Sequence, residues 1–216
     1  MLSEAHNQIL QFKYGLQETM IVSLREIGSI SSLNPVEVRS YLGRADIDSA
    51  GLLIKYHGNG FSTIGLDNPP RGKKGKPQKY LRRSEEPNSL FVPPGVNLGS
   101  QVLWRVEGEL KALCGHGHGL EIVGLSGVFC WRTEGELITL LTREEKLSDE
   151  EALLPELTRI RWEGKEVNLL YDSDITPGHI AYEAFPRLAE QLYRMGALEV
   201  RILSLPSLAK DQKTGL

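Results

Sequence analysis

The feature that most constrains the fold is an alternation of apolar, strand-like runs with helical patterns over the second half of the chain. Helical patterns cover 108–114 and 178–195, and a glutamate-rich stretch at 134–159 fits further helices. The strand-like runs are 101–106, 121–125, 166–171 and 199–203. Such alternation is typical of a mainly parallel β-sheet with helices on its faces. The sequence therefore predicts an α/β domain over 101–216, with a kink or break at Pro186 in the last helix.

The first 100 residues predict a smaller α+β unit. Residues 1–45 have a helical pattern, in which Asn34, Pro35 and Glu37 supply an N-cap, a first helical residue and a capping-box partner. Strand-like runs at 51–56 and 61–66 flank a Gly/Asn-rich connection and predict a β-hairpin. We therefore divide the chain into 1–100 and 101–216.

Three acidic residues directly follow two of the predicted strands. Glu107 follows the strand at 101–106, and Asp172 and Asp174 follow the strand at 166–171. Open α/β sheets place their active groups where strands run out into loops. Carboxylates that converge there would repel one another, and Mg²⁺, which prefers oxygen ligands, is the usual remedy. An isolated Asp-x-Asp is more often turn chemistry, so the joint arrangement of the three acids carries the prediction of a metal site.

A block of positive charge precedes the α/β domain, although the formal net charge of the whole chain is −3. Between positions 71 and 83 there is no acid, and the basic residues are Arg71, Lys73, Lys74, Lys76, Lys79, Arg82 and Arg83. A block of like charge repels itself, and it is typical either of a surface that meets phosphates or of a solvated loop.

Composition excludes several classes of protein. No apolar run approaches the ~18 residues that a membrane span needs, and the N-terminus lacks the basic-then-apolar pattern of a signal peptide. Cys114 and Cys130 are the only cysteines, which argues against a disulfide framework or a four-cysteine zinc site. We expect a cytoplasmic protein without a membrane partner.

The acidic motifs resemble those of the Toprim domain, which bacterial replicative primases, topoisomerases and some nucleases share. The similar residues are Val106-Glu107-Gly108 with Lys111-Ala112-Leu113, and Asp172-Ser173-Asp174 after an apolar strand. The resemblance covers about 101–207 and implies a Rossmann-like fold. It implies acid/base or metal-linked chemistry for Glu107, and Mg²⁺ held by Asp172 and Asp174, with Mn²⁺ as a substitute. We expect Gly108, Lys111 and Ser126 to contact phosphate or nucleotide.

The basic segment narrows the choice among Toprim proteins. Residues 75–91 look like the Pro-Lys-Tyr-Leu stretch that precedes Toprim in bacterial primases, where it meets the template. The chain is still more similar to plasmid- and phage-borne primase-like proteins. The resemblance implies single-stranded DNA and nucleoside triphosphates as partners, with a replicative helicase as a further candidate. The nucleic-acid-binding residues would be Lys73, Lys74, Lys76, Lys79, Tyr80, Arg82 and Arg83.

Two features depart from the pattern of bacterial primases. No zinc ribbon precedes the basic segment, and Asp211 is the only acid after the last predicted strand, where Toprim domains carry a third acidic motif. We therefore expect a domain that is truncated at its C-terminal end or lacks one metal ligand, which puts turnover in question. The alternatives are a metal-dependent Toprim nuclease and a non-catalytic nucleic-acid-binding module that assists replication.

Overall fold

A computed structural model of the chain describes residues 1–57, 60–72, 75–132, 153–172, 182 and 184–204. The chain forms two compact units, Met1–Glu86 and Pro87–Leu216. The boundary lies ahead of the division at residue 100 made on the sequence. The reason is that strand β5 (Leu90–Phe91) pairs with a strand of the second unit.

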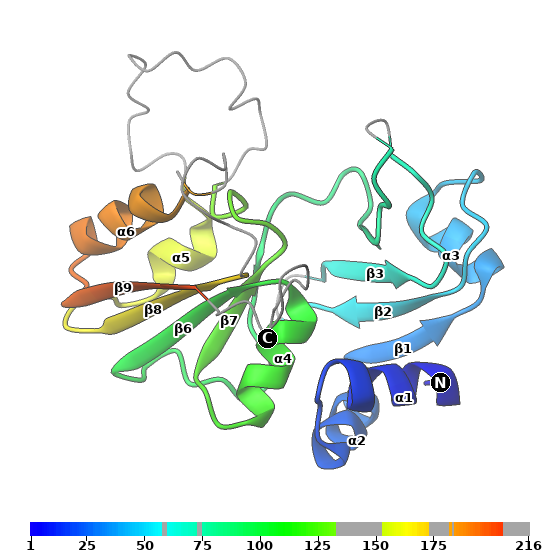
Figure 1. Cartoon of the computed structure of the whole chain (residues 1–216), viewed down its shortest axis with the longest axis horizontal. Coiled ribbons are helices and arrows are strands. Elements are labelled where there is room, and N and C mark those ends of the chain that lie inside the picture. Colours follow the sequence, from blue (N-terminus) through cyan, green and yellow to red (C-terminus); the bar gives the residue numbers. More distant parts are fainter. Residues whose placement is uncertain (58–59, 73–74, 133–152, 173–181, 183, 205–216) are drawn as a thin grey trace, which may run out of the picture. The chain divides into compact units, whose positions relative to one another are not determined.

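The first unit combines helices with a four-stranded antiparallel sheet of order β1-β2-β3-β4 (Figure 1). Its helices are α1 (Glu4–Gln8), the π-helical turn η1 (Ile9–Lys13), α2 (Glu18–Glu26) and α3 (Pro35–Leu42). Its strands are β1 (Ile30–Leu33), β2 (Gly51–Lys55), β3 (Ser62–Leu66) and β4 (Tyr80–Leu81). A core of buried aliphatic residues joins α3 to the sheet: Val38, Leu42, Ile47, Leu53, Ile64 and Leu66.

The predicted hairpin is confirmed, since β2 and β3 pair antiparallel with Leu53 opposite Ile64. The predicted start of α3 is confirmed as well. Asn34 accepts hydrogen bonds from the amides of Val36 and Glu37, and the Glu37 carboxylate accepts one from the Asn34 amide in return. The expectation that residues 1–45 are helical throughout is wrong at β1. Pairing with β2 decides the structure of that segment, and local pattern does not report such pairing.

The second unit is built on a five-stranded sheet of order β5-β7-β6-β8-β9. Besides β5, its strands are β6 (Val102–Glu107), β7 (Ile122–Leu125), β8 (Glu166–Tyr171) and β9 (Glu199–Ser204). Strand β5 pairs antiparallel with β7, whereas β7, β6, β8 and β9 are mutually parallel. The α/β class predicted from the alternation is therefore confirmed.

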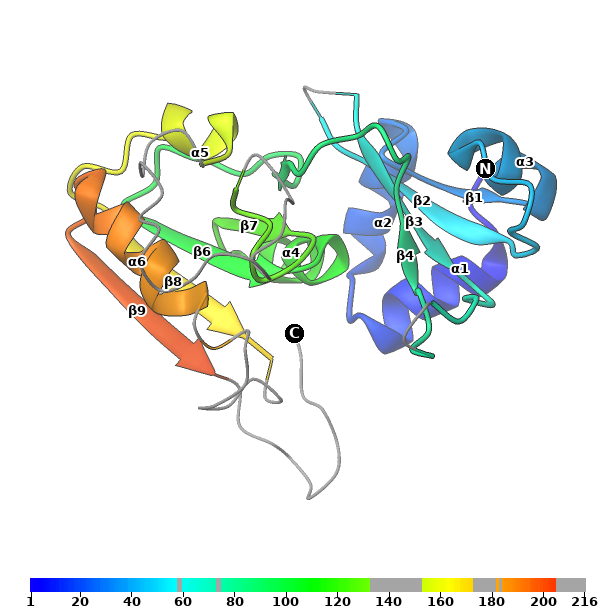
Figure 2. The same ribbon diagram turned by 90° about the horizontal axis from the view of Figure 1, so that it is seen from above.

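Helices cover both faces of this sheet. Figures 1 and 2 show α5 (Pro155–Arg159) and α6 (Ala184–Arg194) on one face and α4 (Glu109–Gly117) on the other. Side chains of α6 pack with Leu169 and Tyr171, while α4 lies against Ile122 and Gly124. Successive residues of a strand point to opposite faces, so the apolar runs of β7 and β8 are buried on both sides, as the sequence predicts for a parallel sheet.

The boundary of one helix differs from that expected. Helix α4 continues through Gly117 instead of ending near residue 114, because Gly115 packs closely on the Ile122 side chain and is held in the helix. Helix α6 is described from Ala184, and Pro186 lies in the first turn of this described part, where an absent N–H is tolerated. The kink at Pro186 stays a prediction. The predicted helical residues 134–152, 178–181 and 183 lie outside the described residues. None of the helices in the described part of the chain is both long and apolar enough to cross a membrane.

Candidate functional site

Glu107 is the last residue of β6, and the chain turns directly from it into α4. Gly108 makes this turn with φ 97°, a conformation that L-residues rarely adopt, and its amide donates to the Leu125 carbonyl at 2.7 Å. A Cβ atom on Gly124 of β7 would lie 2.9 Å from the Gly108 carbonyl oxygen. The two glycines thus bring the start of α4 close to β7, and the helix begins with its amide groups at the strand end that carries Glu107.

Asp172 directly follows β8 and forms an ion pair with Lys111 of α4. The Asp172 side chain is 4% exposed and the Lys111 side chain is 19% exposed. Removing one partner of a buried ion pair is strongly destabilising, because the other charge keeps its desolvation cost. Lys111 therefore links the helix that follows β6 to the end of β8.

The two acids lie where the connections of the sheet diverge. Strands β6 and β8 are adjacent and parallel. From β6 the chain passes through α4 to β7 on one side, and from β8 it passes to α6 and β9 on the other. Ligands of open α/β sheets bind outside the carboxyl ends of the strands at such a reversal. Glu107 and Asp172 therefore belong to the edge where this fold most often binds a ligand.

The register of β6 with β8 fixes the positions of Glu107 and Asp172 along the strand direction. Val106 lies opposite Leu170, so the next residue along, Glu107, is level with Tyr171, and Asp172 is one position further. Burial raises the pKa of the Tyr171 hydroxyl, and the negative charge of Glu107 raises it further, against the opposing effect of Arg105. Alternation along the strand puts Asp172 on the α4 side of the sheet, where Lys111 reaches it.

Ser126, which follows β7, donates a hydrogen bond to the Glu109 carboxylate at 3.3 Å. Glu109 is 4% exposed and lies in the first turn of α4, where the helix dipole favours a negative charge. The predicted phosphate contact Ser126 therefore serves first to join the end of β7 to α4. Sequence reasoning missed Glu109, although an acid at the first position of a helix is a recognisable signal.

The described residues contain no group of three or more His, Cys, Asp or Glu side chains that could hold a metal ion. The predicted ligand Asp174 lies outside them. At this edge they contribute the carboxylates of Glu107 and Asp172, the ammonium of Lys111 and the turn at Gly108.

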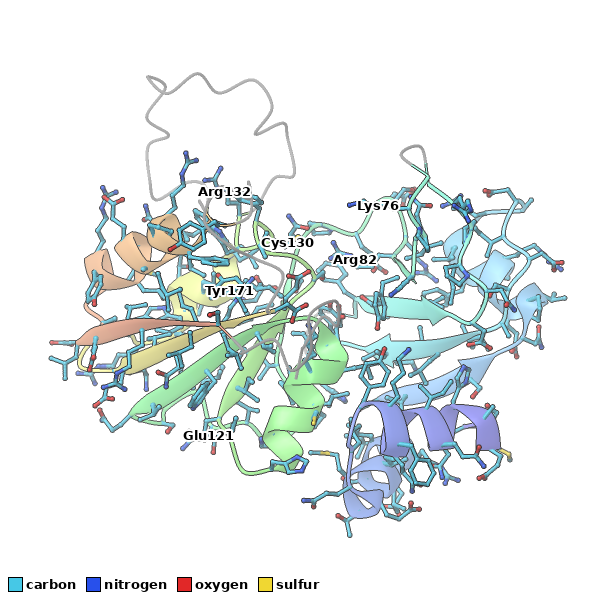
Figure 3. The ribbon with its side chains drawn as sticks, viewed as in Figure 1. Lys76, Arg82, Glu121, Cys130, Arg132 and Tyr171 are labelled. Atoms are coloured by element: carbon cyan, nitrogen blue, oxygen red, sulfur yellow. The ribbon has the colours of Figure 1, made fainter. Side chains whose placement is uncertain are left out.

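The predicted nucleic-acid-binding residues belong to the first unit and differ in their surroundings. Lys76 and Lys79 are exposed, whereas Arg82 is half-buried (Figure 3). Tyr80 of β4 is 45% exposed, and its hydroxyl lies 2.9 Å from that of Tyr14. Lys73 and Lys74 lie outside the described residues.

Arg83 is held more firmly than the lysines of this segment. Its Nε donates to the Tyr41 carbonyl at 2.8 Å, and its guanidinium lies 4.2 Å from the centroid of the Tyr41 ring. Arg83 thereby fixes the segment after β4 to α3, so loss of this side chain would affect the fold of the first unit as well as its charge.

Arg105 was also missed by sequence reasoning. It lies in β6 two residues before Glu107 and is 3% exposed. An arginine inside a strand predicted to be buried on both faces is a usable signal, because buried arginines normally have a partner.

Comparison with known proteins gives one match. Residues 98–215 match a family described as "Domain of unknown function (DUF3854)", which is more than half of the chain. No curated protein and no solved structure matches the chain. The matched segment contains the whole edge formed by Glu107, Lys111 and Asp172.

Proposed function

We propose that this chain, which belongs to the DUF3854 family, is a primase-like nucleotidyltransferase module acting with Mg²⁺ in the replication of a plasmid, phage or mobile element. Its second unit would have the Toprim arrangement, a Rossmann-like sheet with acids at the ends of two neighbouring strands. One observation carries the proposal. Glu107 ends β6 and Asp172 follows β8, and these two strands are adjacent and parallel.

The donor chemistry of this edge fits Mg²⁺. Carboxylate oxygens are ligands that Mg²⁺ prefers, and Mg²⁺ would take the place of the Lys111 ammonium as the cationic partner of Asp172. We expect Asp172 and Asp174 to hold Mg²⁺, or Mn²⁺ in its place. When bound, the metal would neutralise the charge that develops on a transferring phosphoryl group.

The other residues of the edge have roles that follow from their positions. Glu107 would orient the attacking 3′-hydroxyl and accept its proton. The first turn of α4, entered through Gly108, would direct its amides to the phosphates of a nucleoside triphosphate. Lys111 would contact the same phosphates once a metal ion competes for Asp172, and Ser126 lies at the neighbouring strand end.

Single-stranded DNA is the proposed template, and the basic segment of the first unit would bind its backbone. The exposed lysines Lys76 and Lys79 are the best-supported contacts among the described residues. Lys73 and Lys74 belong to the same run of charge, with Tyr80 available for stacking on a base. Binding through phosphates should weaken as salt rises, because counterions are released on binding.

The proposal is tested by primer synthesis. The chain is incubated with single-stranded DNA, ribonucleotides and Mg²⁺, and short products are resolved on a gel. The wild type should give primers and the Asp172→Asn variant none, while Arg194→Met, which breaks an exposed pair with Glu190, should behave as the wild type. Primers that persist in Asp172→Asn would overturn the site. Degradation of the DNA without any need for nucleotides would instead indicate a nuclease.

A second candidate is a non-catalytic nucleic-acid-binding module. The Lys111–Asp172 ion pair favours it, because a metal ion must compete with an ammonium already in contact with the carboxylate. This candidate predicts DNA binding that is unchanged by EDTA and by Asp172→Asn, with no product formed.

A further inference from the structure

The second unit contains buried side-chain donors that lack a hydrogen-bond partner. Within its described part, the buried side-chain nitrogen and oxygen atoms without a partner are Nε and Nη1 of Arg105, the Tyr171 hydroxyl, Nε1 of Trp131 and Nε of Arg132. Buried polar groups are normally hydrogen-bonded, and each exception calls for an explanation. Every one of these groups can donate a hydrogen bond. A set of this kind points to an acceptor, and therefore to an oxyanion, as the ligand.

Arg105 and Tyr171 are two members of this set whose side chains lie in contact. The Arg105 guanidinium lies 4.8 Å from the centroid of the Tyr171 ring, and its Nη2 donates to the Gly127 carbonyl at 3.1 Å. Tyr171 stacks in turn on Phe185 of α6. Figure 3 shows Tyr171, Cys130 and Arg132 on the side of the sheet that α6 covers. The two side chains are therefore fixed in place, with donor atoms left for a further partner.

The charge of this region is positive on balance: Arg105 and Arg132 are buried on this side of the sheet, and one carboxylate, that of Glu107, acts on the Tyr171 hydroxyl. A guanidinium stays protonated in proteins, and Arg105 makes no ion pair with a carboxylate of the described residues. Arg132, on the same side of the sheet, is 6% exposed and lies over the Trp131 ring. Burial lowers the pKa of Arg132, and the positive charge of Arg187 lowers it further. Positive charge is thus buried here at a cost that an anionic ligand would offset.

We propose that Arg105 and Tyr171 bind the terminal phosphate of a small phosphorylated molecule. A phosphate offers several acceptor oxygens to the donors present, and arginine is suited to it. Arg105 is 3% exposed and Tyr171 is 1% exposed. A terminal phosphate can enter such a buried site end-on. A phosphodiester within a nucleic-acid chain has a nucleotide on each side and could not enter in this way. Entry would be at the loop of residues 126–130, which is only half-buried and follows β7 at the carboxyl edge of the sheet.

This site is separated from the proposed metal ligand Asp172, because alternation along β8 puts Tyr171 and Asp172 on opposite faces of the sheet, whereas Glu107 is level with Tyr171. Its test is a calorimetric titration of the full chain in EDTA, so that no divalent metal takes part. The probes are inorganic phosphate, ADP and adenosine. The wild type should bind phosphate and ADP but not adenosine. The Asp172→Asn variant should bind them equally well, which separates this proposal from the proposed function.

Two variants test the assigned residues. Arg105→Lys keeps the charge but removes the guanidinium donors, and ADP should bind roughly tenfold more weakly or worse, as expected for loss of a hydrogen bond to a charged group. Tyr171→Phe keeps the ring on Phe185 and should weaken ADP roughly fivefold. The control Arg161→Met removes an exposed positive charge from the same unit and should leave ADP binding unchanged.

The source of the phosphate is decided by comparing an oligonucleotide that carries a 5′-phosphate with its 5′-hydroxyl form. A preference for the phosphorylated form would assign the site to a strand end, and equal binding would assign it to free nucleotides. The proposal is overturned if the wild type binds neither phosphate nor ADP, or if Tyr171→Phe, folded by circular dichroism, binds ADP as tightly as the wild type. ADP binding by the Tyr171→Phe variant therefore tests the proposed phosphate site even if the Arg105→Lys variant does not fold.

Discussion

The Lys111 ammonium of α4 forms an ion pair with the Asp172 carboxylate at the end of β8, and the aspartate is almost fully buried. The contact joins two elements that are 61 positions apart in the sequence. It also gives Asp172 a cationic partner within the chain. A divalent ion that binds there must compete with the lysine, so Lys111 is central to both the stability and the proposed chemistry of this edge.

Replacing Lys111 with methionine should destabilise the chain. Asp172 would keep its burial and lose its ammonium partner, and breaking a buried pair in this way costs roughly 3 kcal/mol. Urea unfolding followed by circular dichroism measures the change. The control Arg194→Met breaks an exposed i,i+4 pair with Glu190 and should cost about 0.5 kcal/mol or less. The double variant Lys111→Met/Asp172→Asn should regain much of the loss, and a double variant as unstable as Lys111→Met would contradict the assigned pair.

The same substitution should tighten metal binding. With the competing ammonium removed, Mg²⁺ should bind the Lys111→Met variant about tenfold more tightly than the wild type, a difference of about 1.4 kcal/mol. The shift of the melting temperature with Mg²⁺ measures this, because a ligand that binds only the folded state stabilises it. An equal Mg²⁺ response in the two proteins would mean that Lys111 does not compete with the metal.

The close packing of α4 on β7 gives a prediction about stability. An alanine at Gly124 would put its Cβ 2.9 Å from the Gly108 carbonyl oxygen and 3.2 Å from the Ala112 Cβ, so helix and strand must separate. We expect Gly124→Ala to cost about 1 to 3 kcal/mol, as overpacking does. The control Gly99→Ala meets only the end of the Asn97 side chain and should cost far less. Equal unfolding midpoints in urea for the two variants would contradict the close approach.

Sequence periodicity was sufficient to predict the α/β class of the second unit and the β2–β3 hairpin, because burial on one or both faces leaves a regular pattern of apolar residues. It also located Glu107 and Asp172 at strand ends. It could not predict β1, which exists because of its pairing with β2. Nor could it predict the Lys111–Asp172 pair, since this contact depends on the order of β6 and β8 in the sheet.

The basic segment was predicted only as a charge pattern. From charge alone, Arg83 and Lys79 look equivalent, yet Arg83 is bound to Tyr41 through its side chain and Lys79 is exposed. This difference depends on the position of α3 beside the segment after β4. The contact between Arg105 and Tyr171 could not be predicted for a related reason, because it depends on the pairing of β6 with β8.

The two kinds of basic residue should respond differently to mutation. Lys79→Gln should weaken binding to single-stranded DNA and reduce the slope of log affinity against log salt by about 0.7, with stability unchanged. Arg83→Gln should weaken binding and also destabilise the first unit, because it loses the contacts with Tyr41. Fluorescence anisotropy at several salt concentrations, together with thermal unfolding, separates these effects. An unchanged salt slope for Lys79→Gln would exclude it as a phosphate contact.

Cys114 should show a defined dependence on pH. Burial raises the pKa of its thiol above the ordinary value of 9.0, so the thiolate is scarcer in the folded chain than in the unfolded one. In a Cys130→Ser background, iodoacetamide should therefore alkylate the folded chain more slowly than the urea-unfolded chain at pH 8. The gap should narrow as the pH rises through the pKa of the folded state, because the thiolate is the reactive form. Faster alkylation of the folded chain at pH 8 would contradict the direction of the shift.

The central claim is that the edge formed by Glu107 and Asp172 binds a divalent metal. The most direct measurement is a Mn²⁺ titration followed by electron paramagnetic resonance, in which free and bound ion are distinguished. The wild type should have a saturable site from which Mg²⁺ displaces Mn²⁺, and Asp172→Asn should lose that site while Arg194→Met keeps it. Saturable binding that is the same in the wild type and in Asp172→Asn, or no saturable binding in either, would contradict the account.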